Sequence, residues 1–265
     1  LNDSLSLKQI CIPGSHDAGM YFVDILSTKD DANFAHDVAT YFGKGIAQTQ
    51  NKNIYEQLKA GVRYFDIRPQ LYKSEFYLYH GPAFGPSLKA VLADINKFRE
   101  EAKEETIILN FSHFKEFNNT IDKLFIDELA RSFKTEYLFD VEKHKNASGI
   151  LNYNHLFDFP LSDLRGKIIL LIEDNRDMYN NEVLAKNRKG IYYLLKGNNI
   201  NADPIYSVKI FDEYADKEVC HEMVENQKNK FNDFKNSKEL FLLNWTLTTN
   251  EKALIDDIRA VTGTK

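Results

Sequence analysis

The chain has few of the residues that crosslink a protein, anchor it in a membrane or separate its domains. Only Cys11 and Cys220 occur among its 265 residues, so neither a disulfide framework nor a thiolate metal site is indicated, and a single bridge between the two stays open. No apolar run approaches the roughly 18 residues of a membrane span. Six prolines and twelve glycines, without a low-complexity tract, leave no obvious linker. We therefore expect a single domain over residues 1–265.

An excess of positive charge is absent as well. The net charge is −5, which argues against broad electrostatic binding to nucleic acid or to an anionic bilayer, although a local basic patch stays open. The rest of the composition, 43% hydrophobic and 28% charged, is typical of a globular protein that buries a sizeable core.

Apolar runs at strand spacing alternate with amphipathic runs at helical spacing along most of the chain. We expect strands over residues 5–12, 62–69, 76–79, 106–111, 166–172, 205–211 and 240–247. Helices are expected over 53–60, 87–98, 119–133, 213–234 and 251–261, and long loops over 20–50, 134–160 and 174–204. This alternation predicts a parallel sheet with helices outside it.

A histidine and an aspartate stand between two glycines just after the first predicted strand, at His16 and Asp17. Gly14 and Gly19 permit backbone angles and a close ligand approach that other residues resist, and histidine is the side chain whose charge changes nearest neutral pH. A polar turn is the plain alternative for such a dipeptide. Whether the pair carries chemistry therefore depends on the residues at the ends of the other strands.

Several other strands also end in polar side chains. Because strand residues alternate between faces, Asp66 and Arg68 lie on one side of their strand, where they form either a structural ion pair or a ligand for phosphate. His80 directly follows an apolar run, as His16 does. Ser112 and His113 follow another, and for His113 capping, core hydrogen bonding and the site stay open as alternatives.

These residues fall where a barrel of parallel strands carries its functional groups. In such a barrel the functional groups gather at the carboxyl ends of the strands. The sequence therefore predicts that one rim holds His16, Asp66, Arg68, His80, Ser112, Asp212 and Asn244.

Three motifs resemble the X domain of phosphatidylinositol-specific phospholipase C, particularly the bacterial, metal-independent type. They are Pro13–Asp17, Arg63–Arg68 and Tyr79–Pro82, and weaker matches are found at Thr106–Phe111, Arg165–Leu171 and Leu240–Thr246. The resemblance covers nearly the whole chain and implies a distorted TIM-like (β/α) barrel with mostly parallel strands. That architecture agrees with the alternation of strands and helices.

The resemblance also implies a reaction, namely lyase cleavage of a phosphatidylinositol-type lipid into diacylglycerol and inositol 1,2-cyclic phosphate. His16 would act as general base on the inositol 2-hydroxyl, and His80 would protonate the departing diacylglycerol oxygen. Arg68 would hold the non-bridging oxygens as charge develops. Asp17 would assist Arg68 and the leaving group, and Asp66 would orient His80.

Head-group contacts are expected from Ser112, Glu173, Asp212 and Tyr214, on the same resemblance. Bacterial relatives carry a lysine where Ser112 stands and an arginine at or near Glu173, so the head-group pocket differs. Relatives also carry an aspartate on an eighth strand that orients the base histidine. This chain is expected to end before that strand. Three alternatives stay open: the strand lies outside the given sequence, another residue orients the base histidine, or that histidine is unassisted.

The arginine at position 68 bears on the cofactor. Animal members of the family place a carboxylate there to hold calcium, so Arg68 implies no metal cofactor, with Ca²⁺ as the weaker alternative. We expect a phospholipid substrate at a membrane surface, with Phe84 as an apolar residue at the rim. No nucleic-acid partner is expected, and we expect a monomer.

We expect a secreted or extracellular bacterial protein, peripheral to the membrane. The first residue is Leu1, so a signal segment removed upstream stays open. Two other functions also stay open. One is a catalytically weak relative that binds a lipid or head group, and the other is a metal-dependent glycerophosphodiester phosphodiesterase.

Overall fold

The computed structural model describes residues 3–23, 47–81, 83–174, 190–195, 205–237 and 239–248, which belong to two compact units, Leu1–Val208 and Lys209–Lys265. The single domain expected over 1–265 stays a prediction. No helix in the described part of the chain is long and apolar enough to cross a membrane.

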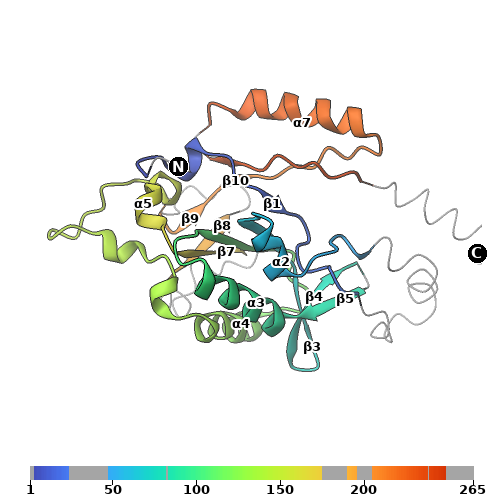
Figure 1. The fold of residues 1–265 in the computed structure, drawn as a ribbon, viewed down its shortest axis with the longest axis horizontal. Coiled ribbons are helices and arrows are strands. Elements are labelled where there is room, and N and C mark those ends of the chain that lie inside the picture. The colour runs from blue at the N-terminus through green and yellow to red at the C-terminus, as the bar shows by residue number, and fades with distance from the viewer. Residues whose placement is uncertain are drawn as a thin grey trace, which may run out of the picture. The chain divides into compact units, whose positions relative to one another are not determined.

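A six-stranded parallel sheet forms the centre of the first unit (Figure 1). Its strands, in spatial order, are β1 (Gly14–Ser15), β2 (Tyr64–Ile67), β6 (Ile107–Phe111), β7 (Ile168–Asp174), β8 (Ile191–Leu195) and β9 (Ser207–Val208). Every neighbouring pair in it is parallel. This confirms the parallel sheet that the apolar strands predict, and β6 and β7 lie close to where they were expected.

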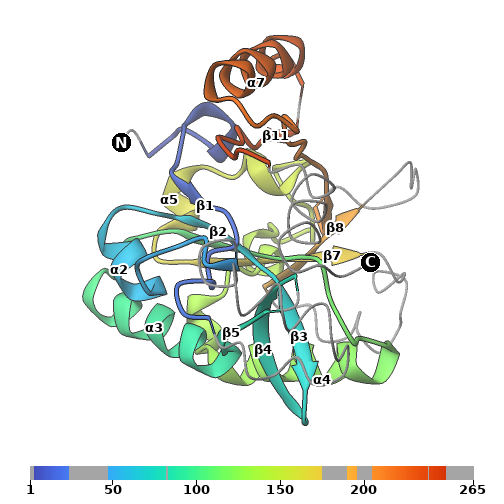
Figure 2. The ribbon, with the colours of Figure 1, turned by 90° about the vertical axis from the view of Figure 1, so that its right-hand side faces the viewer.

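Capped amphipathic helices cover one side of this sheet. They are α2 (Ile54–Lys59), α3 (Leu88–Glu101) and α4 (Asn119–Ser132), and Figures 1 and 2 both show α3 and α4 on the same side of the strands. Asn53 and Glu56 form the expected capping box at the start of α2, and Ser87 accepts from the backbone N–H of Ala90 at the start of α3. Their apolar faces and the facing side chains of the sheet form the buried core. The short helices between the later strands are η2 (Thr135–Tyr137), η3 (Val141–His144), η4 (Leu156–Asp158) and α5 (Leu161–Leu164).

A second sheet was not expected. The strand predicted over 76–79 is the middle strand of an antiparallel sheet of β3 (Pro69–Tyr72), β4 (Glu75–His80) and β5 (Ala83–Ser87), whose strands run side by side in Figure 2. Lys73 and Ser74 join β3 to β4 with positive φ angles of 46° and 67°. Two residues in this conformation form the tight turn of a hairpin, which can connect only antiparallel strands.

The start of the chain also differs from expectation. The strand predicted over 5–12 is instead the 3₁₀ helix η1 (Leu7–Gln9), and the strand β1 comes after it at 14–15. Gln9 accepts from the backbone N–H of Ser6 at 2.9 Å, so a local side-chain hydrogen bond satisfies the backbone that a strand would have paired.

The segment predicted as a loop over 174–204 contains the strand β8, which pairs with β7. Its run of two tyrosines between isoleucine and leucines suits a short buried strand. The helix expected over 251–261 and most of the loop over 20–50 lie outside the described residues.

The second unit contains one helix and one strand pair among its described residues. The helix α7 (Cys220–Phe234) begins seven residues later than predicted, and β10 (Ile210–Phe211) pairs in parallel with β11 (Leu240–Phe241). The predicted strand over 205–211 is thus divided between β9 and β10, and the one over 240–247 is only two residues long. Phe211 and Phe241 stack at 5.1 Å between ring centroids and both contact Phe234.

Candidate active site

The site begins with the alternation of side chains in β2, β6 and β7. Residues in register share a face of the sheet, and Phe65, Leu109 and Leu170 point to the helices on one face. The opposite face carries Asp66 in β2, and two strand positions further on it carries Arg68. Ser112 continues the same face after β6, and Glu173 does so in β7. The sheet therefore brings Asp66, Arg68 and Ser112 to one edge, as the rim prediction has them, and adds Glu173 to that edge.

The loop after β1 places His16 and Asp17 against the end of β2. Asp17 adopts a left-handed backbone conformation with φ 44°, and the N–H of Ala18 donates to the backbone oxygen of Asp66 at 2.8 Å. Gln50 donates to the backbone oxygen of His16, also at 2.8 Å. Hydrogen bonds from both sides therefore fix this loop.

His16 lies between two carboxylates. Its Nδ1 is 3.2 Å from Oδ2 of Asp66, and its Nε2 is 3.2 Å from Oδ2 of Asp17. The expectation that Asp66 orients His80 is therefore corrected, because the histidine that Asp66 contacts is His16. The hydrogen bond from the N–H of Ala18 to the backbone oxygen of Asp66 holds the loop after β1 against β2, and this loop carries His16 beside Asp66.

Arg68 bridges the same two carboxylates. Its Nε is 2.6 Å from Oδ1 of Asp17, and its Nη2 is 3.3 Å from Oδ2 of Asp66. Burial alone would raise the pKa of Asp66, but the hydrogen bond from His16 and the charge of Arg68 hold it well below its usual range. For Asp17, whose side chain is fully buried, burial outweighs the charges of His16 and Arg68 and raises the pKa.

His80 reaches the cluster from the other sheet. It is the last residue of β4, and its Nε2 is 3.6 Å from Oδ2 of Asp17. A Cβ on Gly19 would clash with the side chain of Leu78, so a larger residue here would require Leu78 to move. Oδ2 of Asp17 is thus close to the Nε2 atoms of both His16 and His80.

Ser112 is turned toward the cluster. Its hydroxyl lies 2.9 Å from Oδ1 of Asp66 and 2.8 Å from Nδ1 of His113. His113 has a left-handed backbone with φ 52°, and its N–H donates to Oε2 of Glu173 at 2.8 Å. The hydroxyl of Tyr79 donates to the carbonyl of His113 at 2.5 Å. The structure thus adds Tyr79 to the site and places His113, for which the site was one of three alternatives, beside Ser112. The position of Tyr79 near the end of its strand was the available signal.

Three further predicted residues, Asp212, Tyr214 and Asn244, belong to the second unit. Asp212 accepts from the side chain of Asn244 at 2.8 Å, and Lys230 donates to the carbonyl of Tyr214 at 2.7 Å. The head-group contacts expected from Asp212 and Tyr214 stay predictions, as does the rim position of Asn244.

Residues 28–173 match the family model described as phosphatidylinositol-specific phospholipase C, X domain. The chain belongs to this family. The matched range runs from before β2 to β7, and it contains Asp66, Arg68, His80, Ser112 and Glu173 but not His16 or Asp17.

Similar proteins and structures agree with this assignment. The chain is 34% identical over 176 residues to a 1-phosphatidylinositol phosphodiesterase of Listeria monocytogenes, covering 66% of this chain and 47% of that protein. It is 33% identical over 141 residues to human PI-PLC X domain-containing protein 2, covering 49% and 46%. It spans less than half the length of these curated relatives.

Solved structures of bacterial members show the fold. The phosphatidylinositol-specific phospholipase C from Listeria monocytogenes superposes with a TM-score of 0.61 at 24% identity, over 98% of this chain and 84% of that one. One from Staphylococcus aureus superposes with a TM-score of 0.58 at 20% identity, over 100% and 83%. The predicted TIM-like α/β fold is thereby confirmed.

Three site residues have ligand atoms close enough to one another to hold a cation. Ligand atoms of His16, Asp17 and Asp66 all lie within 4.8 Å of one another. Arg68 already contacts both carboxylates and supplies the positive charge that a bound cation would bring. The absence of a metal cofactor stays a prediction.

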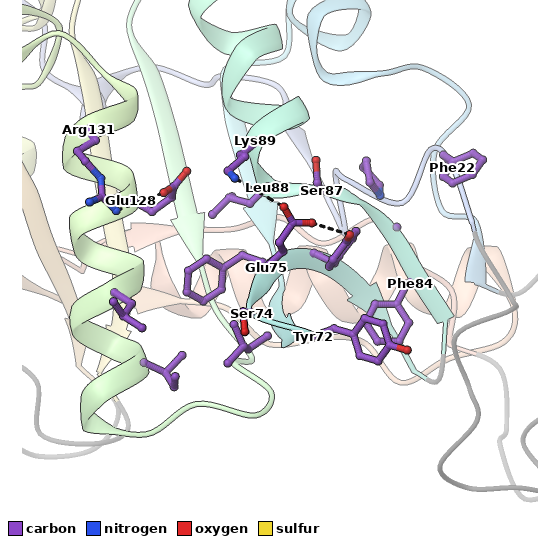
Figure 3. A pocket seen from close by; sticks show the side chains of 17 residues that line it. Phe22, Tyr72, Ser74, Glu75, Phe84, Ser87, Leu88, Lys89, Glu128 and Arg131 are labelled. Atoms are coloured by element: carbon purple, nitrogen blue, oxygen red, sulfur yellow. Dashed lines mark hydrogen bonds and ion pairs between the residues drawn. The ribbon is translucent and has the colours of Figure 1, made fainter.

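An apolar cleft of about 600 Å³ lies between the antiparallel sheet and α4 (Figure 3). None of the predicted site residues lines it. Phe84 was expected to be exposed at the rim, but it is 7% exposed because its ring packs against Tyr72 and Tyr77 in the wall of this cleft. The exposed ring at the cleft is Phe22, at 55%, on the loop that also carries His16.

Proposed function

We propose that the protein is a metal-independent lyase that cleaves a phosphatidylinositol-type lipid into diacylglycerol and inositol 1,2-cyclic phosphate. One observation carries the proposal. Oδ2 of Asp17 lies 3.2 Å from Nε2 of His16 and 3.6 Å from Nε2 of His80, while Arg68 contacts the other oxygen of the same carboxylate. A base, an acid and a fixed positive charge therefore converge on one point.

The reaction would proceed by proton transfer at both ends of a phosphodiester. His16 removes the proton from the 2-hydroxyl of the inositol, whose oxygen then attacks phosphorus. The bond between phosphorus and the glycerol oxygen breaks, and His80 gives its proton to that oxygen. Each such transfer contributes on the order of 10²–10⁴ in rate.

Arg68 would hold the non-bridging phosphate oxygens while charge develops on them. A guanidinium already fixed by two carboxylates needs no reorganisation when the substrate reacts, which is where electrostatic stabilisation is most effective. Asp17 keeps Arg68 in place and lies beside the nitrogen of His80 that faces the leaving group.

The proposed partner is a phospholipid at a membrane surface, and the protein is proposed to act as a secreted monomer. Support for a lipid substrate comes from the names of the Listeria relatives, which include phosphatidylinositol. The apolar cleft and the exposed Phe22 offer apolar surface close to the loop that carries His16.

Phosphorus NMR of purified protein with phosphatidylinositol in detergent micelles and EDTA tests the proposal. The parent should form a cyclic phosphodiester, and His16→Ala and His80→Ala should each form at least a hundredfold less. His221→Ala is the matched control, because this exposed histidine lies on α7 of the second unit.

Other outcomes would contradict the proposal in different ways. Product that disappears with EDTA and returns with Ca²⁺ would indicate a metal-dependent phosphodiesterase. Retained vesicle binding without product under either condition would indicate a binding protein.

A further inference from the structure

We propose that Asp66 is a positioning residue that holds His16 in the tautomer with a proton on Nδ1, and that Ser112 holds Asp66 in turn. This inference rests on the proposed role of His16 as general base. It replaces two sequence-based expectations, since Asp66 was predicted to orient His80 and Ser112 to contact the head group.

The carboxylate of Asp66 is fixed by donors on both oxygens. Oδ1 is 2.9 Å from the hydroxyl of Ser112. Oδ2 lies 3.2 Å from Nδ1 of His16, 3.3 Å from Nη2 of Arg68 and 3.4 Å from the backbone nitrogen of Asp17. Rotation of the carboxylate would break all of these contacts together, so its orientation is set before any substrate binds.

The fixed carboxylate decides which nitrogen of His16 carries the proton. An ionised carboxylate only accepts hydrogen bonds, and the hydrogen bonds and charges around Asp66 hold its pKa well below the usual range. The nitrogen that faces it, Nδ1, therefore donates. A neutral imidazole has one proton, so Nε2 is left as the acceptor. Nε2 lies 3.2 Å from Oδ2 of Asp17, and because burial raises the pKa of Asp17, that carboxyl group is the one that can hold the proton in this contact. The opposite tautomer would place a proton where the base must receive one.

Ser112 acts on Asp66 rather than on the substrate. The hydroxyl of Ser112 has one proton, which it donates in a hydrogen bond to the carboxylate of Asp66. Its oxygen is then the acceptor in the 2.8 Å contact with Nδ1 of His113. The hydroxyl of Ser112 is thus used within the protein. Its removal leaves Oδ1 of Asp66 without this donor, and the carboxylate gains freedom to turn away from His16.

Nitrogen-15 NMR of histidine-labelled protein tests the tautomer without any substrate. The spectra would be recorded at a pH where the ring of His16 is neutral, and its signals would be assigned by their loss in His16→Ala. The parent and Ser112→Thr, which keeps the hydroxyl, should show a protonated Nδ1. Asp66→Asn and Ser112→Ala should move the signals toward protonation at Nε2. Ser207→Ala, a buried serine of β9, is the matched control and should match the parent.

Kinetics on phosphatidylinositol provide the second measurement. Positioning predicts that Ser112→Ala lowers kcat about tenfold with KM unchanged, that Ser112→Thr restores it, and that Asp66→Asn lowers kcat by about 10²–10⁴. A raised KM with unchanged kcat in Ser112→Ala would instead establish a head-group contact.

An unprotonated Nδ1 in the parent would overturn the inference whatever the activity is. A protein without lyase activity but with the expected tautomers would overturn the proposed function while leaving the hydrogen-bond assignment intact. The two failures are therefore distinguishable.

Discussion

Replacing Arg68 with methionine removes the guanidinium and keeps most of the apolar stem. Asp17, whose side chain is fully buried, would lose a contact of 2.6 Å, and Asp66 would lose one of 3.3 Å. Removing one partner of a buried ion pair leaves an uncompensated charge that destabilises a protein by about 3–5 kcal/mol. We expect Arg68→Met to lower the free energy of unfolding by about that amount at pH 7.5.

The loss should shrink at lower pH. Burial already raises the pKa of Asp17, and the charge of Arg68 opposes that rise, so the variant should raise this pKa further. A carboxyl group whose folded pKa exceeds its unfolded value binds more protons in the folded state, so its contribution to stability decreases as pH rises. The depressed pKa of Asp66 acts oppositely in the parent, but its contribution is lost only below pH 4, outside the tested range.

Urea unfolding of parent and variant at pH 5.5 and 7.5 measures the difference. The slope against denaturant should stay constant, so that the midpoints report stability alone. Arg165→Met is the control, because Arg165 pairs with Asp3 and Glu104 at the surface and should change stability little at either pH. A difference for Arg68→Met below about 1 kcal/mol, or one independent of pH, would refute the reasoning.

Three other substitutions test separate features. Burial lowers the pKa of His155 to about 4, so the unfolded chain takes up a proton between pH 6.5 and 4 that the folded chain does not. In thermal melts the parent should lose about 2 kcal/mol of stability over this window, after allowance for partial exposure. His155→Asn, which keeps a side-chain acceptor at this helix cap, should lose less. Gly19→Ala should push Leu78 and the strand behind it outward and lower kcat at least tenfold in a micelle assay, and unchanged turnover would show that the loop adjusts freely. Phe22→Ala should weaken sedimentation with phosphatidylinositol vesicles by about fivefold to tenfold, whereas Ile150→Ala, equally exposed but away from the cleft, should not; equal effects would remove Phe22 as a membrane contact.

Much of the site could be predicted because its residues lie at the ends of strands. The parallel arrangement needed only apolar strands alternating with amphipathic helices, and period two was enough to place Asp66 and Arg68 on one face. The resemblance of the sequence motifs to a known family then predicted roles for His16, Asp17 and His80.

The geometry between separate segments could not be predicted from the sequence. Whether Asp66 faces His16 or His80 depends on the turn at Asp17, whose positive φ no pattern indicated. The direction of Ser112 depends on the register between β2 and β6, which places its hydroxyl beside Asp66.

Short elements were missed for a related reason. The strand β8 has five residues between polar segments, too few for periodicity to be decisive. The hairpin at Lys73 and Ser74 lacks the glycine or asparagine that usually marks such a turn, so its two strands were not expected to be antiparallel.

The two proposed proton-transfer residues are carried by different sheets, His16 by the parallel sheet and His80 by the hairpin of β4 and β5. The loop that carries His16 packs on Leu78 of that hairpin at Gly19, and Oδ2 of Asp17 lies 3.2 Å from His16 and 3.6 Å from His80. A substitution that moves the hairpin would therefore also move His80 relative to His16. In the proposed reaction, the position of the acid and the position of the base are expected to change together.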